Sequence, residues 1–213
     1  MKPTSPAGIG AYYDQLLATH GDTALGAGWP NEADRQLRFG VMRDLGWQGA
    51  PLRSVCDLAC GTGAFLRYLQ AQGAVPETYL GIDLSQAAID IAQKAHPKAD
   101  FICADILSAP PAQRFDYVIA NGLFTVRDTV NEADMWAFMT EMATAMWAMA
   151  DKGIAFNLMS AVVDWQRDDL FHVEIDRLLG FLYPLAGRHV VIRADYGLYE
   201  YTVYVYRAPP ALR

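Results

Sequence analysis

The chain has 213 residues, of which 53% are apolar and 19% charged, a balance typical of a globular protein rather than a disordered one. Its formal net charge of −7, with no cluster of Lys and Arg, disfavours nucleic acid as a partner, because nucleic-acid affinity comes mainly from neutralising phosphates. No apolar run approaches the ~18 residues of a membrane span, and no secretion signal opens the sequence, so we expect a cytoplasmic protein that needs no membrane.

Two helices are expected before the first strand, over 11–20 and 31–45, with a Gly-rich stretch between them and Asn31 as the N-cap of the second. From residue 54 onward, strands and helices alternate. The expected strands span 54–59, 78–83, 100–104, 115–120, 153–159, 189–195 and 199–207, and the expected helices span 64–72, 86–96 (with Ser85 as N-cap), 132–150 and 168–183.

This alternation predicts an α/β fold with a doubly wound, mostly parallel sheet of seven strands. Only the last two strands break the rule, because about three residues separate them. Parallel strands need a long crossover, so these two must form an antiparallel hairpin.

The segment 55–63, Val-Cys-Asp-Leu-Ala-Cys-Gly-Thr-Gly, is an apolar strand that passes through Asp57 into a turn bracketed by Gly61 and Gly63. Glycines in such a turn let a ligand lie against the main chain. Asp83 ends the next strand, twenty positions after Gly63, where a carboxylate can hold the two hydroxyls of an adenosine ribose. Leu66 occupies the third glycine position of a dinucleotide fingerprint, and no Gly-Lys-Ser/Thr sequence follows, so both of those phosphate-binding motifs are excluded.

These residues resemble the first motif of the class I S-adenosylmethionine-dependent methyltransferases, and the resemblance covers roughly residues 54–207. It implies a Rossmann-like sheet in the order 3-2-1-4-5-7-6, with one antiparallel strand, the last-placed, near its C-terminal edge. On this basis we divide the chain into an N-terminal helical cap, 1–50, and a single cofactor-binding unit, 51–213. The implied cofactor is S-adenosyl-L-methionine.

The resemblance also implies which residues bind the cofactor. Asp105, after the third strand, takes the place of the residue that binds the adenine amino group; a helix N-cap or a solvated loop residue is the alternative. Asn121 and Gly122, after the fourth strand, correspond to positions along the methionine part of the cofactor. The full expected set is Asp57, Ala59, Cys60, Gly61, Thr62, Gly63, Asp83, Leu84, Asp105, Ile106, Asn121, Gly122, Tyr13 and Arg38.

Arg38 and Tyr13 are the members of this set that lie in the cap. Arg38 is included because an arginine there could pair with the methionine carboxylate. Arg38 shares its helix with Arg35 and Arg43, so a solvated helical face is the alternative reading, and Tyr13 could equally be a packing residue. The three cysteines show no His/Cys spacing of a metal site, and we read Cys56, Cys60 and Cys103 as small buried hydrophobes.

The acceptor is expected between the cap and the ends of strands four to six, with Phe124, Trp165, Tyr196 and Tyr199 as walls. His172, placed on a helix after a short lid at 160–169, is the candidate general base, although a structural histidine is the common alternative. We expect a methyltransferase for a small molecule, acting as a monomer or homodimer. The alternatives are a non-catalytic module that binds an adenosyl ligand, and a methyltransferase that acts on a protein or tRNA.

Overall fold

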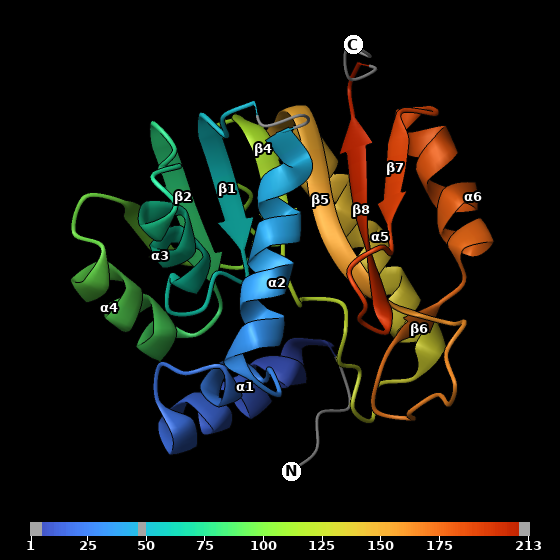
Figure 1. Ribbon diagram of the computed structural model, residues 1–213, viewed down its shortest axis with the longest axis horizontal. Helices are drawn as coiled ribbons and strands as arrows, with labels where there is room; N and C mark the ends of the chain where they lie inside the picture. Colours follow the sequence, from blue (N-terminus) through green and yellow to red (C-terminus); the bar gives the residue numbers. More distant parts are fainter. Residues whose placement is uncertain (1–5, 47–49, 209–213) are drawn as a thin grey trace.

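The computed structural model describes residues 6–46 and 50–208, and in this part of the chain helices cover both faces of a mixed β-sheet (Figure 1). The helices are α1 (Pro6–His20), α2 (Glu32–Arg43), α3 (Ala64–Ala71), α4 (Gln86–Ala95), α5 (Glu132–Met149) and α6 (Ile175–Ala186), with short 3-10 helices η1 (Leu25–Ala27) and η2 (Asp44–Gly46). The strands are β1 (Ser54–Leu58), β2 (Thr78–Asp83), β3 (Asp100–Cys103), β4 (Phe115–Ala120), β5 (Ala150–Ser160), β6 (His172–Val173), β7 (Val190–Arg193) and β8 (Glu200–Tyr206).

The sheet has the strand order β3-β2-β1-β4-β5-β8-β7, which confirms the predicted order because β7 and β8 are the predicted sixth and seventh strands. β8 runs antiparallel to both β5 and β7, as the short hairpin link requires. The pairs from β3 to β5 are parallel, so the carboxyl ends of β1, β2 and β4 meet at one edge. A two-residue strand, β6, was not predicted and pairs with the end of β5.

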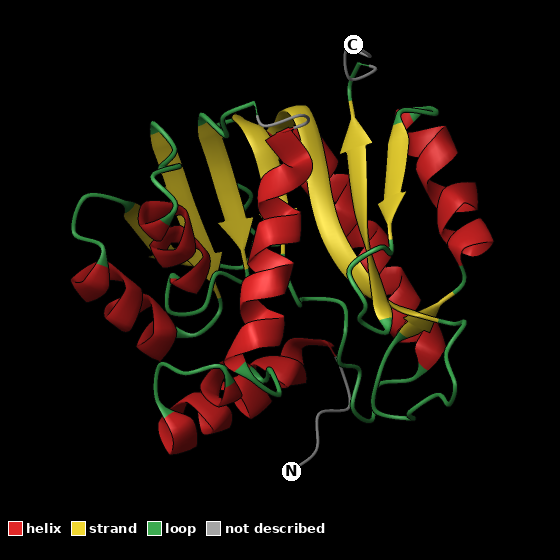
Figure 2. Ribbon diagram, viewed as in Figure 1, coloured by secondary structure: helices red, strands yellow, loops and turns green. Residues whose placement is uncertain are grey.

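The helices form two layers around the sheet (Figure 2). α5 buries Met135, Met139 and Met146 on one face of the sheet, and α6 packs on the same face. Their spacing of four and seven positions puts these methionines on one side of the helix. α2, α3 and α4 supply the apolar cluster on the opposite face. The sheet is therefore buried on both faces, which leaves the edge formed by its strand ends as the place for a site.

The predicted cap separates into two parts. α2 and the 3-10 helix η2 after it belong to a helical layer of the sheet, because the hydroxyls of Tyr204 and Tyr206 of β8 donate hydrogen bonds to the main-chain oxygens of Val41 in α2 and Leu45 in η2. α1 and residues 21–29 instead lie across the edge where β1 and β2 end (Figure 1). The predicted boundary at residue 50 adjoins 47–49, outside the described residues.

The cap residues Asn31 and Ser85 correctly placed the starts of α2 and α4, whereas α1 begins at Pro6 and not at residue 11 as expected. Asn31 caps α2 by accepting from the N–H of Asp34 at 2.8 Å, and Ser85 caps α4 by accepting from the N–H of Ala88 at 3.1 Å. The prediction was wrong for the helix at 168–183, because α6 begins at Ile175. Residues 172 and 173 hydrogen-bond to β5 instead. Cys103, expected to be buried, is exposed on the edge strand β3.

Candidate active site

A cavity of about 340 Å³ lies at the carboxyl ends of β1, β2 and β4. Its floor is formed by the turn after β1 and by the first residues after β2, β3 and β4. Residues of α1 and of the segment 21–29 cover it on the side away from the sheet. Of the expected cofactor residues, the cavity lining contains Tyr13, Asp57, Ala59, Cys60, Gly61, Thr62, Asp83, Leu84, Asp105, Ile106, Asn121 and Gly122. The topology therefore brings twelve of the fourteen together, and only Gly63 and Arg38 lie outside the lining.

The turn after β1 holds three residues in the left-handed backbone region: Ala59 (φ 54°), Gly61 (φ 53°) and Gly63 (φ 76°). A Cβ on Gly61 would meet no atom within 4 Å, so its main chain is open to the cavity. A Cβ on Gly63 would lie 2.8 Å from Cδ2 of His96 and 3.1 Å from the ring of Phe101. Only Gly61 therefore offers close approach to a ligand, whereas Gly63 is required by packing behind the turn.

Asp83 ends β2 with its carboxylate held by two main-chain donors. The N–H of Gly61 donates to Oδ2 at 2.8 Å, and the N–H of Ser85 donates to Oδ1 at 2.9 Å. Burial raises the pKa of Asp83, and these two hydrogen bonds oppose the rise. Each oxygen retains a second lone pair, so this fixed carboxylate can accept two hydroxyl groups of a ligand.

Asp57 lies on β1 and is only 3% exposed. The hydroxyl of Tyr79 donates to its Oδ2 at 2.5 Å. Burial raises the pKa of Asp57 to about 7; the Tyr79 bond opposes this and the nearby Asp83 adds to it. A cationic group in the cavity would relieve the cost of ionising this carboxyl, because an opposite charge favours the charged form.

Arg35, on α2, is the arginine that lines the cavity, and it is 6% exposed. Its Nη2 pairs with Glu32 at 2.7 Å, while Nε and Nη1 are buried with no hydrogen-bond partner among the described residues. The expected arginine, Arg38, points elsewhere and binds Glu200 through Nε at 2.9 and 3.0 Å. Sequence reasoning missed Arg35 because both arginines share one helix and only the contact with Glu200 tells them apart.

The residues after β3 and β4 complete the floor. The carboxylate of Asp105 accepts from the N–H of Leu107 at 2.9 Å and from the hydroxyl of Ser108 at 2.7 Å, so it stabilises its own turn while lining the cavity. Asn121 lines the cavity with its Oδ1 buried and without a partner in the described chain. An orphaned acceptor of this kind is costly unless a ligand or water pairs with it.

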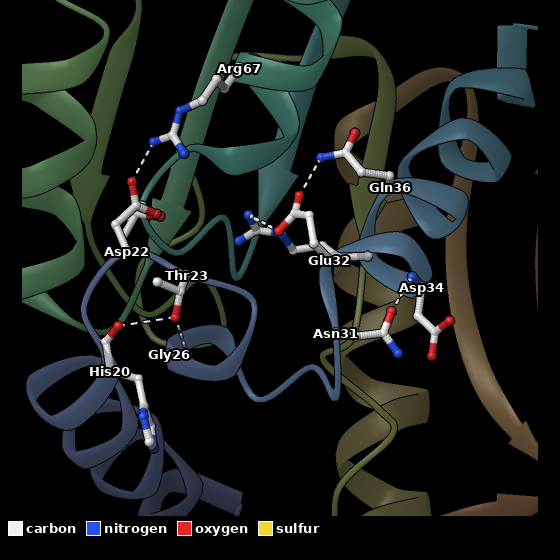
Figure 3. Close-up of polar contacts among 11 residues, drawn as sticks. His20, Asp22, Thr23, Gly26, Asn31, Glu32, Asp34, Gln36 and Arg67 are labelled. Atoms are coloured by element: carbon white, nitrogen blue, oxygen red, sulfur yellow. Dashed lines mark hydrogen bonds and ion pairs between the residues drawn. The ribbon is translucent and has the colours of Figure 1, made fainter.

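Residues 21–29, which cover the cavity, are connected to the turn after β1 through Asp22. The carboxylate of Asp22 accepts from the hydroxyl of Thr62 and from Nη2 of Arg67, each at 2.5 Å. Figure 3 shows the pair of Asp22 with Arg67, and beside it the turn in which Thr23 contacts His20 and Gly26. Because Asp22 and Arg67 are both partly exposed, this tie is of the kind that contributes about 1 kcal/mol or less.

Cys60 lines the cavity, and burial raises the pKa of its thiol well above the ordinary value. A thiol of this kind stays protonated and packs as a small hydrophobe, which agrees with the expectation for this residue.

The expected acceptor residues do not line the cavity. Phe124 is fully buried in the core, 5.5 Å from the ring of Phe156. Tyr196 is buried and hydrogen-bonds with Thr202 at 3.0 Å. Trp165 and Tyr199 form an exposed pair of rings 5.9 Å apart, outside the cavity lining; these two residues are 67% and 54% exposed.

His172 lies on β6 rather than on a helix, and both of its ring nitrogens are engaged. Nδ1 donates to the main-chain oxygen of Ser160 at 2.7 Å, so Nε2 is the acceptor for the N–H of Arg167 at 3.2 Å. With both nitrogens engaged, the imidazole bridges two stretches of backbone and presents no free lone pair to a substrate proton. Its contacts indicate a structural role.

Within the described ranges, 6–46 and 50–208, no helix combines the length and apolarity that crossing a bilayer would need. Within the same ranges, no group of three or more His, Cys, Asp or Glu side chains could hold a metal ion.

Residues 55–147 match a family of sequences described as a methyltransferase domain. The chain is also 32% identical, over 160 residues, to a protein of Mycobacterium tuberculosis (strain ATCC 25618 / H37Rv) named as a methyltransferase, Rv1506c. That match covers 73% of this chain and 93% of the relative.

Solved structures share the fold at low sequence identity. Magnesium protoporphyrin IX methyltransferase (ChlM) from Synechocystis PCC 6803, solved with bound SAM, has a TM-score of 0.64 and 16% identity, covering 95% of this chain and 97% of its own. The N-methyltransferase NodS from Bradyrhizobium japonicum WM9, solved with S-adenosyl-l-homocysteine, has a TM-score of 0.61 and 16% identity, covering 94% of this chain and 98% of its own.

Proposed function

Because the chain belongs to the class I S-adenosylmethionine-dependent methyltransferase family, we propose that it transfers a methyl group from S-adenosylmethionine to a small-molecule acceptor. The cavity lining contains residues suited to three polar parts of that cofactor. Asp83 can accept the two ribose hydroxyls, and Asp57 can oppose the ammonium group. Arg35 can pair with the carboxylate.

The observation that carries the proposal is the guanidinium of Arg35, two of whose nitrogens have no partner in the described part of the chain, in the same lining as the Asp83 carboxylate. A buried cation with free donors is costly unless an anion completes it. The carboxylate of an amino-acid head group would do so, and Asp57 would balance the ammonium beside it. Apolar side chains of Leu84, Ile106 and Leu107 supply the surfaces that an adenine ring needs.

When bound, S-adenosylmethionine supplies an electrophilic methyl group on a positively charged sulfur. Displacement at this carbon is in line, so the main task of the protein is to hold the cofactor in one orientation and keep water away. Asp83 holds the ribose hydroxyls by hydrogen bonds and Arg35 holds the carboxylate by its charge, so the cofactor is fixed at two separate points, and residues 21–29 exclude water. The lining presents no free histidine, so we assign no general base.

The acceptor we propose is compact. The cavity of about 340 Å³ is near the lower end of the usual range for ligand pockets, about 300–1,000 Å³. The part beyond β4 is apolar, with Leu123, Val126, Phe138 and Met142 in the lining. These residues replace Phe124 and Tyr196 as our candidate walls, while Trp165 and Tyr199 remain candidates only for an outer surface.

Calorimetry with S-adenosylmethionine tests the cofactor assignment. We expect one site per chain in the micromolar range, about −8 kcal/mol, and no heat with NAD. Arg35→Met should weaken binding by about 10- to 100-fold, the effect of losing a charged hydrogen-bond partner, whereas Arg43→Met on the same helix should not. Binding of NAD in place of the adenosyl ligand, or equal effects of the two variants, would contradict the assignment.

Release of S-adenosylhomocysteine in the presence of metabolite mixtures tests the enzymatic step. Release with a small-molecule fraction is the expected result. Binding without release from any fraction would favour a non-catalytic module, and release only with protein or tRNA would move the acceptor to that class.

A further inference from the structure

We propose that Glu200 and Arg38 are positioning residues, which hold Trp29 as the wall of the cavity at the end where the methyl group is transferred. Neither Glu200 nor Arg38 lines the cavity, but Trp29 does. The inference rests on the proposed function and concerns the part of the same cavity beyond β4.

The ion pair itself is deeply buried. The side chains of Arg38 and Glu200 are 9% and 1% exposed, and Nε of Arg38 lies 2.9 and 3.0 Å from the two carboxylate oxygens. Nη1 of Arg38 is buried with no partner among the described residues. A buried, incompletely paired ion pair often contributes less stability than apolar side chains of the same volume would. Its presence in the fold therefore calls for a role other than stability.

Arg38 connects this pair to Trp29. The guanidinium lies 4.3 Å from the centre of the Trp29 ring, within the range of a cation–π contact. The ring in turn rests on Gly122, because a Cβ on that glycine would be 2.6 and 2.7 Å from Cζ2 and Cη2 of the indole. The indole is thus held between a fixed cation and a stretch of main chain.

That stretch of main chain is itself fixed. The N–H of Gly122 donates to Oδ1 of Asn157 at 2.7 Å, and Asn157 is fully buried on β5. Glu200 begins β8, the strand that pairs with β5 in the sheet. The two groups that hold Trp29, Gly122 and Arg38, are therefore fixed by residues of the neighbouring strands β5 and β8. A shift of the ion pair between Arg38 and Glu200 would move the Trp29 ring.

The sheet order puts this wall on the side of the cavity beyond β4. Asp83, the proposed ribose partner, ends β2, and the order β2-β1-β4 separates it from Gly122, which follows β4. The sulfur and its methyl group lie between the ribose and the amino-acid head of the cofactor. A cofactor with its ribose at Asp83 and its head across the turn after β1 therefore leaves the part of the cavity beyond β4, where Trp29 lies, for the methyl group and the acceptor. Displacing the ring would widen the cavity at the reacting carbon and lower the precision on which in-line transfer depends.

A double-mutant cycle on binding of S-adenosylmethionine tests the role. We expect Glu200→Gln and Trp29→Leu each to weaken binding about tenfold, and the combined variant to bind like Trp29→Leu alone, because Glu200 acts through the ring. S-adenosylhomocysteine lacks the methyl group, so its affinity should fall by at most about threefold in each variant. Trp147→Leu is the matched control. The guanidinium of Arg207 lies 4.2 Å from the centre of the Trp147 ring, but Trp147 is outside the cavity lining. This substitution should change the affinity for neither ligand.

Because Glu200→Gln leaves a buried cation and can impair folding, the pair Arg38→Met with Glu200→Leu removes both charges together. We expect this variant to fold and to lose S-adenosylmethionine affinity about tenfold, with no further loss when Trp29→Leu is added. Additive effects in the cycle, equal losses for the two ligands, or wild-type affinity in the charge-free variant would each overturn the positioning role. Absence of S-adenosylmethionine binding by the unchanged chain would overturn the proposed function, and this inference with it.

Discussion

Replacing Asp57 by Asn should raise the stability of the protein at alkaline pH while weakening cofactor binding. Burial raises the pKa of this carboxyl from 3.8 to about 7. Below about pH 4 the group is protonated in the folded and unfolded chains alike and has no pH-dependent cost. Between about pH 4 and pH 7 the unfolded chain releases the proton first, so the free energy of unfolding falls as the pH rises. The full loss, about 4 kcal/mol for a difference of about three pKa units, is present above pH 7.

The Asp57→Asn variant has no carboxyl to ionise, and its amide oxygen can still accept the hydrogen bond from Tyr79. Urea unfolding should therefore show the variant to be more stable than wild type by only about 1 kcal/mol at pH 4.5, where the loss in the wild type has just begun, and by up to about 4 kcal/mol at pH 8. S-adenosylmethionine should bind about 10- to 100-fold more weakly to the variant, because the ammonium loses its partner. Asp90→Asn, on the exposed face of α4, is the control for a generic change of charge.

Binding should also release protons from the wild-type chain. At pH 7 about half of the Asp57 carboxyls are protonated, and an ammonium placed beside them would lower the pKa and release about 0.5 proton per ligand. Calorimetry in two buffers of different ionisation enthalpy measures this number. A variant that is less stable than wild type by the same amount at pH 4.5 and pH 8, or proton release that persists in Asp57→Asn, would refute the reasoning.

Three further substitutions separate ligand contacts from packing. Asp83→Ala should weaken S-adenosylmethionine binding by about 1.5–3 kcal/mol with a much smaller change in stability; a loss of stability with unchanged affinity would make Asp83 structural. Gly63→Val should lower the thermal midpoint through the clash with His96 at a positive φ, and adding His96→Ala should recover part of it; a stable Gly63→Val chain would contradict the packing. His172→Gln should leave the pH profile of turnover unchanged between pH 5 and pH 9. A rate loss of about 10²-fold or more that depends on an ionisation would instead show that His172 acts as the general base.

The sequence by itself determined the features that depend on neighbouring residues. The strand that leads into Gly61, the carboxylate at the end of β2, and the caps Asn31 and Ser85 are local patterns of backbone conformation and hydrogen bonding, and the structure has them where the pattern predicts. The antiparallel hairpin was likewise determined by the length of its link. The strand order was implied by the resemblance of the turn after β1 to the methyltransferase family, and with that order the floor of the cavity could be predicted.

Only the tertiary structure decided which arginine of α2 faces the cavity and whether His172 is available for catalysis. Arg35 and Arg38 occupy the same helix, and the contact that takes Arg38 away from the cavity is with Glu200, 162 positions along the chain. His172 carries no local sign that Ser160 and Arg167 would engage both of its nitrogens. The partner of a side chain is set by packing between elements distant in sequence. Residue type and local periodicity do not encode that packing, so the roles of these residues had to be found in the structure.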